Sequence, residues 1–164
     1  MSTENPYDKF LDGRPVETIL GETAGKIAEY LELIGTGKTM EPAAPGKWSA
    51  AEIVSHLADC ELVFGFRLRQ TLAEENPTIE PFDQDHWAKA YKGVPARLAL
   101  EAFSAVRKWN LRLIKDAMPG AAGRKMTHPE RGTMTFMTVV ETMAGHDLNH
   151  LGQLKGLAER QGTK

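Results

Sequence analysis

Two histidines, His146 and His150, stand four residues apart in a segment whose apolar residues have helical spacing. On a helix these positions share one face, with Cβ atoms about 5–6 Å apart, so both imidazoles can reach one metal ion at about 2.0–2.1 Å. Together with Gln153, they interrupt a seven-residue rhythm of core positions, namely Phe136, Met143, His150 and Leu157 on one line and Val139, His146 and Gln153 on the next. Burying such groups without partners costs about 1–3 kcal/mol each. The pattern therefore favours metal binding over its alternatives, a hydrogen-bonded core cluster or a partly open cleft.

A third metal ligand would have to come from another helix, and His56 is the best candidate. It lies beside the apolar stripe of an earlier helical segment, between Ile53 and Cys60. Three neutral imidazoles leave at least one coordination position open, which is typical of catalytic rather than closed structural metal sites. Imidazole suits several divalent metals, so the expected cofactor is zinc, nickel or iron(II).

Other polar residues flank these histidines and could take part in the chemistry. Asp59, Glu61 and Asp147 are the acidic candidates for a general base in hydrolysis. Gln153 and Cys60 are expected beside the ligands. Cys60 has three readings: a fourth soft ligand, a redox-sensitive neighbour, or a small apolar core residue.

The two remaining histidines fit a metal site less well. His86 lies in a long connecting segment and is expected at the surface, although it could reach the mouth of the site. His128 precedes Pro129 in a predicted loop, and a metal role there would require the loop to fold back.

Two known metal motifs resemble the pair at 146 and 150 only in part. The protease motif H-E-x-x-H needs a glutamate where this chain has Asp147, one methylene shorter, and only 14 residues follow His150 to supply a further ligand. A ferritin-like di-iron centre needs Glu-x-x-His pairs, but Ile53 and Met143 stand three residues before His56 and His146.

The composition indicates a water-soluble globular chain. It has 164 residues, 41% of them hydrophobic and 26% charged, with 20 basic and 22 acidic residues for a net charge of -2. The one basic stretch, at Arg107, Lys108, Arg112 and Lys115, has helical spacing and is interpreted as a solvated face, so nucleic acid is not an expected partner. A single cysteine, the lack of a signal sequence and the lack of a long apolar run predict a cytoplasmic protein that is not embedded in a membrane.

Four amphipathic helices must position the candidate ligands. We expect them at 15–34, from Ser49 to before Pro77, from Pro95 to 119–120, and from between Thr133 and Thr138 to Gln161 with Gly162 as its stop. Ser49 and Glu52 form a capping box that starts the second helix. The expected core stripe of the third helix is Leu98, Ala102, Phe103, Val106, Trp109, Leu113 and Ala117.

The predicted fold is an all-α four-helix bundle forming one domain over 1–164, with 1–12 as a loosely ordered tail and no strands. A long crossover at 78–93, with a short helical turn around 84–91, joins the second and third helices. Up-down-up-down order is the plain interpretation, but this connection could instead lead to a non-adjacent position.

With one histidine in the second helix and two in the last, the sequence resembles the DinB-like superfamily, also called DNA-damage-inducible or YfiT-type metalloenzymes. The resemblance covers about Ile19 to Leu157 and rests on four stretches: Trp48-Ser49, His56-Leu57-Ala58-Asp59-Cys60-Glu61, His128-Pro129-Glu130-Arg131-Gly132 and His146-Asp147-Leu148-Asn149-His150-Leu151-Gly152-Gln153. It implies a bundle with a crossover after the second helix, metal ligands at His56, His146 and His150, and a homodimer. Cys60 departs from the apolar residue expected there.

The resemblance also suggests the activity. Its characterised members include transferases and isomerases that use low-molecular-weight thiols such as bacillithiol or mycothiol, and others are described as hydrolases. We therefore expect a metal-dependent enzyme that acts on a small molecule, as a thiol-dependent S-transferase or a hydrolase. The alternatives are a non-catalytic metal- or ligand-binding stress-response protein, and a metal-free bundle that works through protein interactions.

Overall fold

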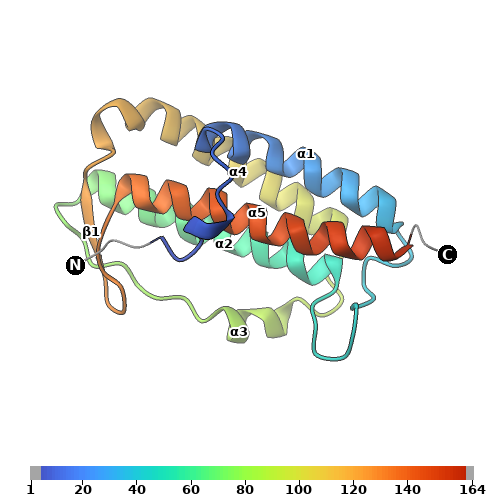
Figure 1. Cartoon of the computed structure of the whole chain (residues 1–164). Helices are drawn as coiled ribbons and strands as arrows, with labels where there is room; N and C mark the ends of the chain where they lie inside the picture. Colours follow the sequence, from blue (N-terminus) through green and yellow to red (C-terminus); the bar gives the residue numbers. More distant parts are fainter. Residues whose placement is uncertain (1–4, 162–164) are drawn as a thin grey trace.

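Each of the four long amphipathic segments forms one helix in the computed structural model, which describes residues 5–161 (Figure 1). These helices are α1 (Val16–Ile34), α2 (Ala50–Ala73), α4 (Ala96–Ala121) and α5 (Phe136–Gln161). The shorter elements are η1 (Asp8–Phe10), α3 (Gln84–Trp87), η2 (Ala88–Ala90), β1 (Lys125–His128) and β2 (Gly132–Thr135). The predicted all-α four-helix bundle is confirmed. In the described part of the chain, no helix is long and apolar enough to cross a membrane.

The start of α2 follows from its sequence. The Ser49 hydroxyl accepts from the Glu52 N–H at 3.3 Å, and the Glu52 carboxylate accepts from the Ser49 N–H at 2.8 Å. This reciprocal pair satisfies two backbone donors that a helix start otherwise leaves free. The predicted capping box is confirmed, and it fixes the register of the helix that carries His56.

The order of the helices differs from up-down-up-down. Figure 1 shows α1 and α5 running in one direction and α2 and α4 in the other, with the segment between α2 and α4 returning along the bundle. Glu61 of α2 pairs with Arg107 of α4, whereas Thr23 of α1 bonds Asp147 of α5. The plain interpretation was wrong and the crossover alternative is the one observed. The crossover lets α2 and α4 pack as parallel neighbours.

The apolar core forms two clusters along the bundle. One contains Leu68, Met126 and Phe136, among others, and extends along α5 to Ala144. The other contains Ile27, Ile53 and Phe103, and its first buried residue from α5 is Leu154. The segment of α5 between these clusters carries His146 and His150, so the candidate site interrupts the core at mid-helix.

The buried face of α4 agrees with the predicted one only in part, since Phe103 is buried and Leu113 and Ala117 pack against the core. Leu98 and Trp109, expected in the core, are 58% and 67% exposed. The buried residues of α4 are Ala96, Ala99, Phe103, Arg107, Asn110, Ile114 and Ala121. Arg107 is also not on a solvated basic face, because it is only 3% exposed. Apolar spacing alone did not predict this buried face, because two of its central residues, Arg107 and Asn110, are polar.

A β-hairpin occupies the segment expected to be a loop. Strands β1 and β2 pair antiparallel, with Met126 opposite Met134 and His128 opposite Gly132. The expectation of no strands was wrong for this segment. Each strand has only four residues, too few for a convincing period-two pattern, and buried Met126 and Met134 anchor the hairpin on the core.

The N-terminal segment also differs from the expected loosely ordered tail over 1–12. Residues 8–10 form η1, and the Tyr7 ring makes an edge contact with the His146 ring at 5.0 Å between centroids. The segment contacts α5, and partly buried Leu11 packs against the core cluster that includes residues of α5. Residues 1–4 of the predicted tail, and Gly162 as the predicted helix stop, lie outside the described residues.

Candidate metal centre

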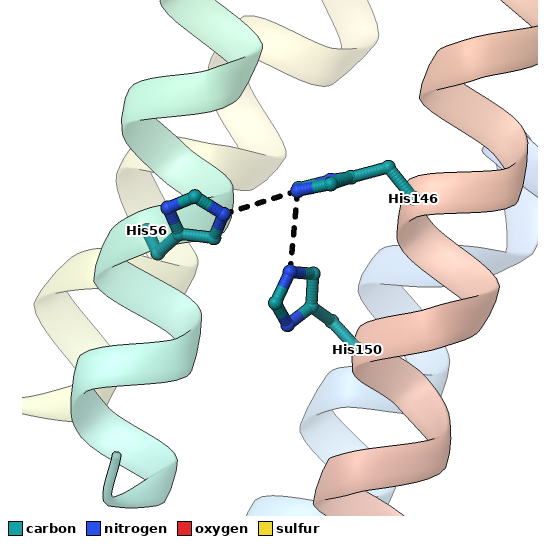
Figure 2. Close-up of side chains that lie close together, drawn as sticks. All are labelled: His56, His146 and His150. Atoms are coloured by element: carbon teal, nitrogen blue, oxygen red, sulfur yellow. Dashed lines mark hydrogen bonds between the residues drawn. The ribbon is translucent and has the colours of Figure 1, made fainter. Parts of the chain in front are cut away.

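Three buried histidines meet between α2 and α5 (Figure 2). His56 projects from α2, and His146 and His150 project from successive turns of α5. The Nε2 atom of His146 lies 3.0 Å from Nε2 of His56 and 3.2 Å from Nε2 of His150. All three candidate ligands are therefore brought together, with His146 in the central position.

The two separations that involve His146 fit ligands of a single metal ion, and all three ligand atoms lie within 4.8 Å of one another. Two nitrogens bound at about 2.0–2.1 Å, with angles between octahedral and tetrahedral, lie about 2.8–3.4 Å apart. The two measured separations, 3.0 and 3.2 Å, fall in this range. A hydrogen-bonded cluster is a poorer explanation, because Nε2 of His146 would have to satisfy two neighbouring nitrogens with at most one proton.

The surroundings of the cluster favour neutral imidazoles, the form that binds metal. Burial, followed by the charge of His150, lowers the pKa of His56 to about 3. Burial is also the main cause that lowers the pKa of His146 and of His150. Near neutral pH each ring therefore has a free lone pair on one of its nitrogens.

Gln153 holds the orientation of His150. Its Oε1 lies 3.0 Å from Nδ1 of His150, so Nδ1–H donates to the amide and leaves the Nε2 lone pair facing the other histidines. The prediction that Gln153 occupies a core line was wrong, because this residue is exposed and Leu154 fills the core instead. The Gln153 side chain thus lies at the edge of the site and binds the nitrogen of His150 that does not face the other histidines.

Cys60 lies one helical turn after His56 and faces the same cluster. Its Sγ is 3.4 Å from Nε2 of His56 and 3.9 Å from Nε2 of His146. Burial and the charge of Asp59 raise the pKa of this thiol, so the protonated form is favoured in the absence of a metal. Cys60 thus contacts two candidate ligands rather than only packing in the core.

Two of the three acidic candidates point away from the histidines. Arg107 donates to Asp147 at 2.6 Å and to Glu61 at 2.7 Å, and all three side chains are buried. Burial lowers the pKa of Arg107, but the two carboxylates outweigh it and raise the pKa overall. The third candidate, Asp59, accepts a hydrogen bond from the Tyr91 hydroxyl at 2.8 Å. Glu61 and Asp147 therefore stabilise the helices that carry the ligands.

A cavity opens on each side of the histidine cluster. One, of about 650 Å³, is lined by His56, His150 and Trp48, and the other, of about 530 Å³, by His146 and Cys60. Tyr7 and Gln84 line both cavities. The crossover therefore lines both cavities, and so does the N-terminal segment, which the sequence did not connect with the site.

The two other histidines take different positions. His86 is exposed and pairs with Asp83, as expected for a surface residue. His128 is 3% exposed in β1 and lines the smaller cavity together with His146. The fold-back judged necessary for His128 to approach the site is supplied by the hairpin.

We predict that acid destabilises the metal-free protein through these histidines. An unfolded chain protonates histidine near pH 6.5, whereas His56 in the fold does so only near pH 3. The free energy of unfolding should therefore fall as the pH drops from 7 to 4, by about 1.4 kcal/mol per pH unit for each histidine protonated only when unfolded. Urea unfolding of chelator-treated protein measures this slope. The double variant H146L/H150L should show a shallower slope, and an equal slope would contradict the prediction.

A second prediction concerns the contact that places Tyr7 over the site. A Cβ added to Gly145 would lie 2.5 Å from the backbone oxygen of Tyr7, so the N-terminal segment would have to move. Gly145→Ala should lower the free energy of unfolding by about 1–2 kcal/mol. Gly152→Ala on the same helix meets nothing within 4 Å and should stabilise by about 0.5–1 kcal/mol. Equal stabilisation of both variants in urea unfolding would refute the close contact.

The chain is similar to several known proteins. The model of the DinB superfamily matches residues 19–154. A protein of Oceanobacillus iheyensis named "putative metal-dependent hydrolase" is 31% identical, over 98% of this chain and 99% of its own length. One with the same description from Bacillus mycoides is 24% identical, over 96% of this chain and 88% of its own length.

A solved structure shares the fold. It is YfiT from Bacillus subtilis, described as "a probable metal-dependent hydrolase with an unusual four-helix bundle topology". The TM-score is 0.82 at 22% identity, and the match covers 99% of this chain and 91% of that one. The same arrangement of helices thus occurs in both chains.

Proposed function

Because this chain belongs to the DinB superfamily, we propose that it is a metal-dependent hydrolase of a small molecule, with a divalent ion held by His56, His146 and His150. The observation that carries the proposal is the convergence of the three buried Nε2 atoms, two pairs of which are 3.0 and 3.2 Å apart. The names of the relatives from Oceanobacillus iheyensis and Bacillus mycoides support hydrolysis.

The chain's own residues would prepare the site for a metal. A divalent ion on three neutral ligands lowers the pKa of water to about 7 and keeps a thiol deprotonated, so either becomes a nucleophile at neutral pH. Gln153 fixes the ring of His150, and the ion pairs of Arg107 tie α5 to α2 through Asp147 and Glu61. Such preorganisation keeps the ligands in place without rearrangement during turnover.

The surroundings also favour a small substrate. The rings of Trp48 and His56 lie 4.9 Å apart between centroids, and Trp48 stacks on His150 at 6.4 Å. On the other side, Tyr7 packs edge-on against His146. These aromatic rings line the cavities, which have room for a small molecule.

One observation favours a second activity, thiol-dependent S-transfer. Hydrolysis commonly uses a general base beside the reacting water, but Glu61 and Asp147 are both held by Arg107. A thiol activated directly by a metal needs no such base. The placement of these carboxylates therefore keeps a low-molecular-weight thiol as the alternative co-substrate.

A paired assay tests the proposal. Zinc-, nickel- and iron(II)-loaded protein would be screened against activated carboxylic and phosphate esters, and against an electrophile such as an aryl halide with glutathione, cysteine or bacillithiol. We expect the wild-type protein to hydrolyse an ester. A chelator should abolish this activity and added metal should restore it, and the His56→Ala variant should be inactive. If only the thiol-dependent reaction is observed, the proposed activity would be S-transfer rather than hydrolysis. Neither activity in fully loaded protein would favour a non-catalytic metal-binding protein.

A further inference from the structure

The cavity of about 530 Å³ extends from the histidine cluster to the β1–β2 hairpin. It is lined by His146 and Cys60 and also by Arg67, His128 and Arg131. Arg67 follows Cys60 by seven residues on α2, so the two share a face and lie about 10 Å apart along the helix axis. The same cavity thus joins the candidate metal centre to a group of basic side chains.

Arg67 carries a buried charge without an anionic partner among the described residues. The residue is 9% exposed, and its Nη2 donates to the backbone oxygen of Glu80 at 2.7 Å. Its Nε is buried without a hydrogen-bond partner in residues 5–161. Burial, and then the charge of Arg131, lowers the pKa of Arg67. A guanidinium in this position is costly to bury unless an anion compensates it.

The hairpin adds two further donors to the cavity. Nδ1 of buried His128 accepts from the backbone N–H of Glu130 at 3.2 Å, which places the ring proton on Nε2 and makes that atom a donor. Arg131 follows at the hairpin turn, and its charge affects the pKa of both Arg67 and His128. Buried Arg67, buried His128 and exposed Arg131 therefore line one cavity.

The acidic residues that line this cavity do not neutralise the buried charge. Asp83 and Glu130 are both exposed. Asp83 is engaged with His86, whose Nδ1 lies 2.9 Å from its carboxylate. Water screens both carboxylates, whereas Arg67 is shielded from water.

We propose that this cavity binds an anionic group of the substrate, a carboxylate or a phosphate, between Arg67 and Arg131, with His128 as a neutral donor. The assignment as a substrate subsite rests on the proposed function at the adjoining histidines. The substrate is then a small acid whose oxyanion lies at the hairpin end of the cavity while its reacting group lies at the histidines. Planar guanidinium groups suit either oxyanion, because they can donate two parallel hydrogen bonds.

Calorimetric titration of metal-loaded protein with inorganic phosphate, and separately with succinate, tests the proposal. Arg131→Gln and Arg67→Met should each weaken binding about tenfold or more, and Arg131→Lys should recover part of the loss. The matched control Arg112→Gln removes an equal charge from an exposed ion pair with Asp116 and should change the affinity less than twofold. Tighter binding of phosphate than of succinate would indicate a phosphate ester, and the reverse order a carboxylate.

Metal content, measured on the same samples, separates this proposal from the proposed function. Arginine-dependent anion binding in protein that takes up no metal would contradict the metal site and support the anion site. Anion binding that is lost when the metal is removed, but is unchanged by both arginine substitutions, would overturn the anion site. The anion would then be a ligand of the metal ion. Failure of the wild-type protein to bind either anion would also overturn it.

Discussion

Arg107→Met should lower the free energy of unfolding by about 3–5 kcal/mol. Arg107 is buried and donates to Asp147, to Glu61 and to the backbone oxygen of Leu20. Methionine fills much of the same space but leaves two buried carboxylates without a cation, which is the costly way to break an ion-pair network. Urea unfolding at neutral pH measures the change.

Arg112→Met is the matched control for this prediction. Arg112 lies on the same helix and pairs with Asp116 at 2.6 Å, but both side chains are exposed, so its loss should cost less than about 1 kcal/mol. The triple variant R107M/E61Q/D147N removes the unpaired charges and should regain part of the lost stability. Equal effects of Arg107→Met and Arg112→Met would show that the buried network does not stabilise the bundle.

The second large effect is expected at the centre of the histidine cluster. His146→Ala should weaken metal binding by more than about 100-fold, because loss of an outer partner of a ligand alone typically costs 10–100-fold. Gln153→Ala, which removes the amide that orients His150, should fall in that smaller range. Competition with a chelator of known affinity measures both.

The exposed His86 provides the control for metal binding. It lies outside the cluster and pairs with Asp83, so His86→Ala should leave the metal affinity unchanged. Circular dichroism of the metal-free proteins would show whether His146→Ala still folds. A folded His146→Ala variant that binds metal as the wild type does would contradict the assignment of this ligand.

Much of the site could be predicted because local rules determine it. The i,i+4 spacing of His146 and His150 places them on one face wherever that helix packs, and the capping box sets the start of the helix that bears His56. The convergence of the three side chains also needs the two helices to be neighbours, with His56 facing the pair at the same level of the bundle. The shared face of the two histidines and the start of α2 could therefore be predicted without knowing the order of the helices.

The roles of the acidic residues could not be obtained from nearness in sequence. Each helical residue turns the side chain by about 100°, so Asp147 faces away from His146, and Glu61, five residues after His56, is rotated by about 140°. Both meet Arg107 of α4 instead. The pattern of apolar residues did not reveal Arg107 as this partner, because an arginine in a sequence is normally interpreted as a surface residue.

The covering segments could not be predicted for a different reason. The short hairpin and η1 are ordered by contacts with distant residues rather than by their own propensities, as the approach of Tyr7 to Gly145 shows. His128 and Arg131 therefore reach the smaller cavity through tertiary structure alone.

The most direct test of the metal centre is the metal content of the untagged wild-type chain, measured by elemental analysis after purification without chelators. We predict about one divalent ion per chain, which His56→Ala and His150→Ala both lose while remaining helical. Wild-type protein that holds less than about one ion per ten chains, even after incubation with zinc, nickel or iron(II), would contradict a metal centre at these three histidines.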